Sequence, residues 1–315
     1  DAVEEMTTLT LSGTASLLHN NLACSTSGWV ATIHNSVNDA GGSRILLNKF
    51  GAQSKDGPEI ILAMSLRYID LPSGPVLVVS STNGTQIYNE DATALLFFVP
   101  INDLAADTDK LKHHQGTCLV PHLQHIVVGT SKGSLMLVQA TAPDFIALPE
   151  CMPSQSDLEC SGVADVCFCA STNQVVSAHS SGELRVWTVS ELAPYENAHV
   201  VPAVGQAPVR VAALGARLLV AYGPGTICLF DAASYELQVE ISAHARWVTA
   251  VDVREDLGFV ASVGEDTALN VWTVDAGTGQ VALQHTSVVT DKLLTGVAMF
   301  GSEVLVSSYD SCDLC

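Results

Sequence analysis

Short apolar runs separated by turns rich in Ser and Gly recur along the whole chain. In each repeat a Val/Leu-rich run is followed by a turn and by a second apolar run that ends near an aromatic residue. Such short runs with alternating side chains are typical of β-strands, and the repeats show no pattern of an amphipathic helix. The clearest repeats are residues 76–88, 126–138, 175–187, 218–230 and 260–272.

The turn glycines set the length of the repeat. They lie 49, 49 and 43 residues apart, at Gly84, Gly133, Gly182 and Gly225. A period in the forties is typical of β-propellers, in which each repeat forms one radially placed sheet. We expect inner strands at 16–20, 60–66, 117–120, 163–168, 209–213, 248–253 and 296–300, and outer strands at 44–48, 95–99, 145–148, 200–204, 237–241 and 281–285. The pattern therefore predicts an all-β, seven-bladed propeller.

The opening segment supplies one strand that the repeats do not use. Residues 6–11 (Met-Thr-Thr-Leu-Thr-Leu) alternate apolar and Thr side chains, whereas the seventh repeat lacks an outer strand. We expect this segment to complete the last blade and to close the ring, which would remove two exposed sheet edges. A disordered tail is the alternative. The prediction is a single domain over 1–315, with blades at 13–51, 58–100, 116–149, 162–204, 208–241, 246–286 and 293–315 plus 6–11.

One repeat carries four polar residues that can bond to one another. His244 precedes its first strand, Ser262 lies in the second, Asp266 is in the next turn and Trp272 is in the third strand. A carboxylate can hold an imidazole that meets a hydroxyl and an indole N–H, so that every polar group has a partner. The alternative is a Ser-His-Asp catalytic set. Because the indole completes the structural arrangement, we interpret the four residues as a hydrogen-bonded brace.

The stretch from 241 to 275 resembles a repeat of the WD40 family of β-propellers. The Ala243-His244 dipeptide, Asp266 and the end at Trp272 carry the resemblance, with lesser support from Asn20-Asn21-Leu22 and Tyr309-Asp310. The resemblance implies a non-enzymatic scaffold that binds a peptide or a protein on one face. The matching positions on that face are Arg246, Trp247, Glu265, Tyr309, Thr82, Ser131 and Ser180.

Within this face, Trp247 follows Arg246 directly. An aromatic residue beside an Arg is typical of interaction hot spots. Partial burial of the ring against a neighbouring blade is the alternative.

Charge narrows the class of partner. The chain has 33 acidic and 13 basic residues, a formal net charge of -20. This field repels nucleic acid and anionic lipid, so we expect a protein or peptide partner and no nucleic acid; a basic partner, such as a tail or a Lys-rich helix, is one interpretation of the charge. The apolar runs are far shorter than the roughly 20 residues of a membrane-spanning helix, which argues against direct membrane insertion. A merely soluble acidic surface is the other reading of this charge.

The cysteines and histidines do not form a metal-binding pattern. The nine cysteines are an odd number, and Cys312-Asp313-Leu314-Cys315 has no second pair at zinc spacing. The pairs His113-His114 and His122/His125 lack supporting ligands nearby. We therefore expect no metal and no cofactor, and a reducing, cytoplasmic location, with a ciliary or vesicle-associated setting as a variant.

Two other functions remain as alternatives. Gly129-Thr130-Ser131-Lys132-Gly133 matches the nucleophile elbow of hydrolases, but that chemistry needs a strand followed by a helix, and a strand-like run follows here. A structural subunit of a large trafficking or ciliary assembly, with the blade sides as its interface, is the second alternative. The polar connections 102–115 and 142–162 are interpreted as surface excursions between blades.

Overall fold

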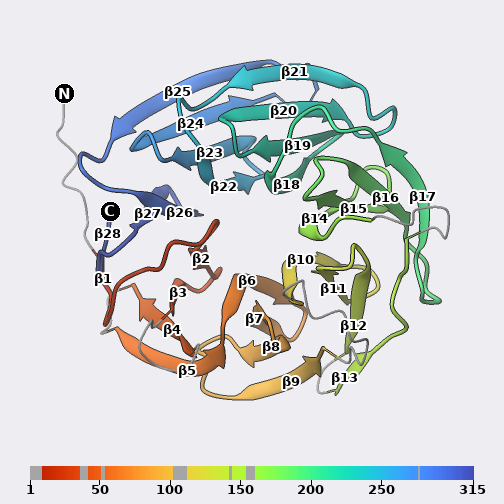
Figure 1. Cartoon of the computed structure of the whole chain (residues 1–315), viewed down its shortest axis with the longest axis horizontal. Coiled ribbons are helices and arrows are strands. Elements are labelled where there is room, and N and C mark those ends of the chain that lie inside the picture. The colour runs from red at the N-terminus through yellow and green to blue at the C-terminus, as the bar shows by residue number, and fades with distance from the viewer. Residues whose placement is uncertain are drawn as a thin grey trace.

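The computed structural model describes residues 9–35, 42–50, 54–101, 112–141, 144–153, 160–275 and 277–315. In these ranges the chain forms an all-β propeller whose sheets stand radially around a central axis (Figure 1). No helix in the described ranges is long and apolar enough to cross a membrane. Residues 102–111, 142–143 and 154–159 of the two long connections lie outside the described part.

Six sheets have four antiparallel strands each, in chain order from the axis outward. The first two are β2 (Ala23–Cys24), β3 (Trp29–Asn35), β4 (Gly42–Lys49), β5 (Lys55–Ile61) and β6 (Ala63–Leu71), β7 (Gly74–Ser81), β8 (Gly84–Asn89), β9 (Leu95–Pro100). The next two are β10 (His114–Val120), β11 (His125–Thr130), β12 (Leu135–Thr141), β13 (Asp144–Ala147) and β14 (Val163–Cys169), β15 (Gln174–His179), β16 (Leu184–Thr188), β17 (Glu196–Val201). The last two are β18 (Pro208–Leu214), β19 (Arg217–Tyr222), β20 (Thr226–Asp231), β21 (Leu237–Ser242) and β22 (Val248–Arg254), β23 (Phe259–Gly264), β24 (Ala268–Val274), β25 (Val281–Val288).

The prediction of seven blades is wrong, because the described residues form six. The remaining strands form two separate two-stranded sheets, β26 (Leu294–Phe300) with β27 (Glu303–Ser308), and β1 (Leu9–Thr10) with β28 (Asp313–Leu314). The turn after β27 contains Asp310 at φ 53°, and β28 is only two residues long. Among the described residues after β27, Cys315 exchanges two backbone hydrogen bonds with Val306, and the turn residue Ser311 donates to the Ser308 carbonyl. One such pair does not make a continuous four-stranded ladder.

The two ends of the described chain nevertheless meet. Leu9 pairs with Leu314 and Thr10 with Asp313, and the Leu11 N–H donates to the Cys312 carbonyl. The expected strand was longer, and its residues 6–8 lie outside the described part. The contact forms a sheet of its own and is not the outer strand of a seventh blade.

Apolar side chains on both faces of the inner three strands form the core between neighbouring sheets. Every residue of β11 and β19 is buried, as are most residues of β12 and β20. Strands buried on both faces read as nearly continuous apolar runs, which explains the Val/Leu-rich repeats. At the start of β8, directly after the β7–β8 turn, Gly84 has φ +136°, and a Cβ there would lie 2.1 Å from the Val99 carbonyl oxygen. Glycine is therefore required at this turn.

The first blade departs from the strands expected from the sequence. Residues 16–20 form a loop, and the inner strand is β2. The expected outer strand at 44–48 is the third strand, β4, and the outer strand is β5, with the sequence Lys-Asp-Gly-Pro-Glu-Ile-Ile. Charged residues, Gly and Pro are typical of loops, but a sheet edge tolerates them because its outer backbone groups face solvent.

Candidate functional site

His244, Ser262, Asp266 and Trp272 lie together in the sixth blade. His244 Nδ1 is 2.9 Å from Asp266 Oδ1, and His244 Nε2 is 2.9 Å from Ser262 Oγ. The Trp272 indole N–H donates to Ser262 Oγ at 3.1 Å, and the Ala245 N–H donates to Asp266 Oδ2 at 2.8 Å. Ser262 has no exposed surface, so its hydroxyl is not accessible to a substrate in this structure. The arrangement ties the turn before β22 to β23 and β24.

The environment of Asp266 favours its ionised form. Partial burial alone raises the pKa of this carboxyl. Hydrogen bonds from His244 and from the Ala245 N–H outweigh burial and hold the pKa below its usual value. Asp266 is therefore a carboxylate at neutral pH and accepts both hydrogen bonds.

A second network of the same type lies in the fourth blade. Ser177 Oγ accepts the Trp187 indole N–H at 2.9 Å and lies 2.9 Å from His179 Nε2. The other imidazole nitrogen, Nδ1, is 2.8 Å from the Ser161 carbonyl oxygen. All three side chains are completely buried, and burial lowers the pKa of His179.

Sequence reasoning missed this second network. The Ser and the Trp are ten residues apart in both blades, so their spacing was a usable signal. The imidazole, however, comes from the strand β15 in the fourth blade and from the turn before β22 in the sixth. A motif that places the His before the first strand therefore detects only the sixth blade.

The segment between β1 and β2 reaches the axis of the ring and connects distant blades (Figure 1). The Asn20 side chain donates to the Val209 carbonyl and accepts the Val251 N–H, contacting β18 and β22. The Asn21 side chain donates to the Ser16 and Ile33 carbonyls and accepts the Ile33 N–H. The Asn21 N–H donates to the Thr295 carbonyl on β26. The axial segment, defined as residues 12–22, is thus a tie between the first blade, the fifth and sixth blades and β26.

Trp247 contacts the axial segment through the ring of His19. Its ring packs on Gly223, where a Cβ would come within 2.1 Å of the ring, and the His19 ring is stacked on it with centroids 6.2 Å apart. Trp247 is half-buried, whereas Arg246 and Glu265 beside it are exposed. Trp247 therefore packs on the neighbouring fifth blade. This is the contact expected from the alternative interpretation of the residue.

The other residues of the expected face lie at the same end of the blades. Tyr309 is 49% exposed, and its N–H donates to the Leu293 carbonyl. Thr82 and Ser131 are half-buried in the turns β7–β8 and β11–β12, and Ser180 is exposed in the turn β15–β16. Arg246 and Glu265 occupy the turns before β22 and after β23. We call this end of the molecule the turn face.

Ser131 does not stand on a nucleophile elbow. It lies between two strands, β11 and β12, and its hydroxyl oxygen accepts the His113 N–H at 3.1 Å. A nucleophile elbow instead requires a sharp turn from a strand into a helix. The local structure thus gives no support to the hydrolase alternative.

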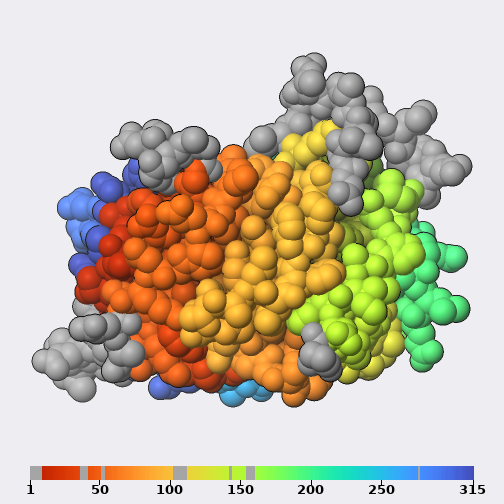
Figure 2. All heavy atoms as spheres, turned by 90° about the horizontal axis from the view of Figure 1, so that it is seen from below, coloured from red at the N-terminus to blue at the C-terminus, as the bar shows by residue number. Residues whose placement is uncertain are grey.

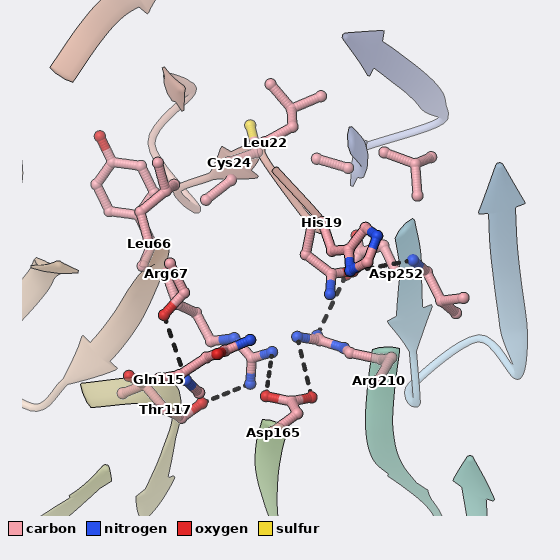
Figure 3. Close-up of a pocket in the computed structure, with 18 of the residues that line it drawn as sticks. His19, Leu22, Cys24, Leu66, Arg67, Gln115, Thr117, Asp165, Arg210 and Asp252 are labelled. Carbon is pink, nitrogen blue, oxygen red and sulfur yellow. Dashed lines mark hydrogen bonds and ion pairs between the residues drawn. The ribbon is translucent and has the colours of Figure 1, made fainter. Parts of the chain in front are cut away.

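Four charged residues from different inner strands meet in an axial cavity of about 200 Å³ (Figure 3). Arg67 Nη2 is 3.5 Å from Asp165 Oδ1, and Arg210 lies 3.8 Å from Asp165 and 3.9 Å from Asp252. Asp165 also accepts the Val211 N–H, and Asp252 accepts the Met299 N–H. Burial raises the pKa of both carboxyls, with the positive charge of Arg67 opposing the shift. Two arginines and two aspartates, joined by three ion pairs, therefore link four inner strands around the axis.

Cys160, His179 and Glu183 are close enough to be considered as metal ligands. Their ligand atoms lie within 4.8 Å of one another. However, both nitrogens of His179 already have hydrogen-bond partners, and Glu183 pairs with Arg185 at 2.8 Å. A cation would have to displace these contacts. The cluster is better suited to joining β14 and β15 than to binding a metal.

No disulfide joins two cysteines in the described part of the chain. Cys167 and Cys169 pack in one apolar cluster between the fourth and fifth blades. Burial raises the pKa of Cys24 to about 12 and of Cys228 to about 11. At neutral pH these thiols are protonated, and the buried ones act as small apolar side chains.

Comparison with known proteins gives the same picture as the fold. WD repeat-containing protein 54 of Mus musculus is 25% identical over 271 residues, which is 80% of this chain and 77% of that protein. The Homo sapiens protein of the same name is 24% identical over 267 residues, with the same coverage. Among solved structures, a chain of a Crystal Structure of Mitotic Checkpoint Complex superposes with a TM-score of 0.74 over 100% of this chain and 95% of that chain, at 15% identity. That likeness concerns the fold alone.

The match to a family model extends over nearly the whole chain. The model described as WDR54 matches residues 13–314, which include both hydrogen-bonded networks, the turn face and all of the axial segment except its first residue. The resemblance to WD40-repeat propellers expected from the sequence is confirmed. The WD-repeat propeller is a fold that is typical of protein-interaction scaffolds. The chain belongs to the WDR54 family of WD-repeat proteins.

Proposed function

We propose that this protein is a non-enzymatic scaffold that binds a protein or peptide partner on the turn face. The observation that carries the proposal is the division of polar groups between the interior and this face. The His, Ser and Asp side chains of the two networks bond to one another and are largely buried, whereas Arg246, Glu265 and Tyr309 are exposed. The exposed side chains of the turn face are therefore the ones that a partner could contact.

Exposed charged and aromatic residues favour a polar protein surface as the ligand. Arg and Tyr are enriched among residues that dominate binding energies, and both are present at the turn face. Leu17, 56% exposed in the axial segment, adds an apolar contact. The net charge of -20 favours a basic partner by long-range attraction. We further propose a cytoplasmic setting, because no disulfide joins two of the described cysteines.

Co-purification from cells followed by mass spectrometry tests the proposal. The variants Arg246→Glu and Tyr309→Ala should lose partners that the unaltered chain retains. The matched control is Leu257→Ala, because Leu257 is 53% exposed in the β22–β23 turn at the opposite end of the blades. An unchanged partner set in folded Arg246→Glu and Tyr309→Ala proteins would exclude the turn face as the binding surface.

A further inference from the structure

The outer strand of the second blade, β9, differs from the outer strands of the other blades. Its sequence is Leu-Leu-Phe-Phe-Val-Pro, without a polar side chain, and Leu95 and Leu96 are 53% and 42% exposed. The strands β5, β13, β17 and β21 each contain a charged residue, and β25 has consecutive Gln, His, Thr and Ser residues. An apolar outer strand is therefore particular to this side of the ring.

The apolar surface continues onto the next blade. Phe97 on β9 stacks on Phe145 of β13 with ring centroids 5.9 Å apart, and Ile146 is 56% exposed. Figure 2 looks onto this side, where the gold surface of β9 lies beside the lime surface of β13. We call the surface formed by β9, Phe145 and Ile146 the β9 flank.

The backbone of β9 is also open to a further strand. β9 is the last strand of its sheet, and its outer edge pairs with no other strand in the described ranges. An open apolar edge is a template for strand pairing, and proteins ordinarily protect such edges with charged side chains. Pro100 blocks only the end of β9, so residues 95–99 remain available.

Charge indicates which kind of segment fits. Asp144, next to Phe145 on β13, is exposed, whereas Glu59 is paired with Arg44 and Lys55 with Asp91, each at 3.2 Å. At the Pro100 end of β9, Lys112, Lys132 and Glu150 line one cavity with Val99. A second copy would bring another net charge of -20 against the first. We infer that the β9 flank binds, by strand addition, an extended segment of another protein that alternates apolar residues with Lys or Arg. This surface is separate from the turn face, so the two proposals stand or fall independently.

A fluorescent peptide, Lys-Val-Lys-Val-Lys-Val-Lys with blocked ends, serves as the probe. Fluorescence anisotropy with the full chain should show binding that weakens with added salt. Hydrogen exchange should show new protection within residues 95–99 in the complex. Leu96→Lys should weaken binding by about tenfold or more, because it places a charge in the centre of the contact. The matched control Val288→Lys alters a residue that is 62% exposed on β25 and should bind as the unaltered chain does.

Two further probes separate strand addition from other contacts. A peptide with Glu in place of each Lys should not bind, and a peptide N-methylated at every residue should lose binding because neither of its edges retains an N–H donor. The inference is overturned by the absence of binding, by equal binding of either altered peptide, or by exchange protection outside β9. Self-association of the free chain that Leu96→Lys abolishes would instead identify a second copy as the occupant.

Discussion

Replacing Asn21 by Ala tests how much of the stability depends on the axial segment. Asn21 is 1% exposed, and its side chain makes three hydrogen bonds of 2.7–2.9 Å, two to Ile33 and one to Ser16. At about 1 kcal/mol each, and with the buried Ile33 N–H left without its acceptor, the expected loss in the free energy of unfolding is about 3–5 kcal/mol. A domain is usually stable by only about 5–15 kcal/mol, so the loss is large.

Denaturation by urea, followed by Trp fluorescence, measures this loss. The control is Asn83→Ala, an exposed Asn whose side chain makes no hydrogen bond to the described residues. This control should change the free energy of unfolding by less than about 0.5 kcal/mol. If Asn21→Ala loses no more than the control, the axial segment does not stabilise the packing of the blades.

Three further predictions concern other buried groups. Ser177→Ala leaves the Trp187 indole N–H without its acceptor and should lower the free energy of unfolding in urea by about 2–3 kcal/mol. Burial, with help from the neighbouring His113, lowers the pKa of His114 to about 4, so stability should fall as the pH drops from 6.5 towards 4, and His114→Asn should remove this part of the pH dependence. Gly223→Ala places a Cβ 2.1 Å from the Trp247 ring, so the Trp fluorescence should shift and the melting temperature should fall; an unchanged spectrum would contradict this packing.

The sequence predicted the strands best where one blade packs between two others. The inner strands expected at 163–168, 209–213 and 248–253 lie within β14, β18 and β22. Most of their apolar residues are buried, on both faces of the sheet, so the local pattern reflects the fold directly. The sequence pattern did not predict the strand β5, because an outer strand can contain Lys, Gly and Pro, which are otherwise typical of loops.

The number of blades could not be read from the same pattern. It depends on whether β26 and β27 pair with strands from the opposite end of the chain, and no local periodicity reports such contacts. The polar networks likewise include one that the sequence predicts and others that it does not. The His244 network follows from sequence spacing, whereas the His179 network and the cover of Trp247 by His19 depend on residues that approach one another only in three dimensions.

The axial segment also has a bearing on shortened versions of this protein. A chain that begins at Ala23 would keep the strands of all six four-stranded blades, yet it would lack Asn20, Asn21 and the β1 partner of β28. A deletion that removes these residues would therefore lose both the hydrogen bonds at the axis and the pairing of the two chain ends. A partner that no longer binds such a shortened chain could be lost because the propeller is destabilised, and its loss would not locate the binding site.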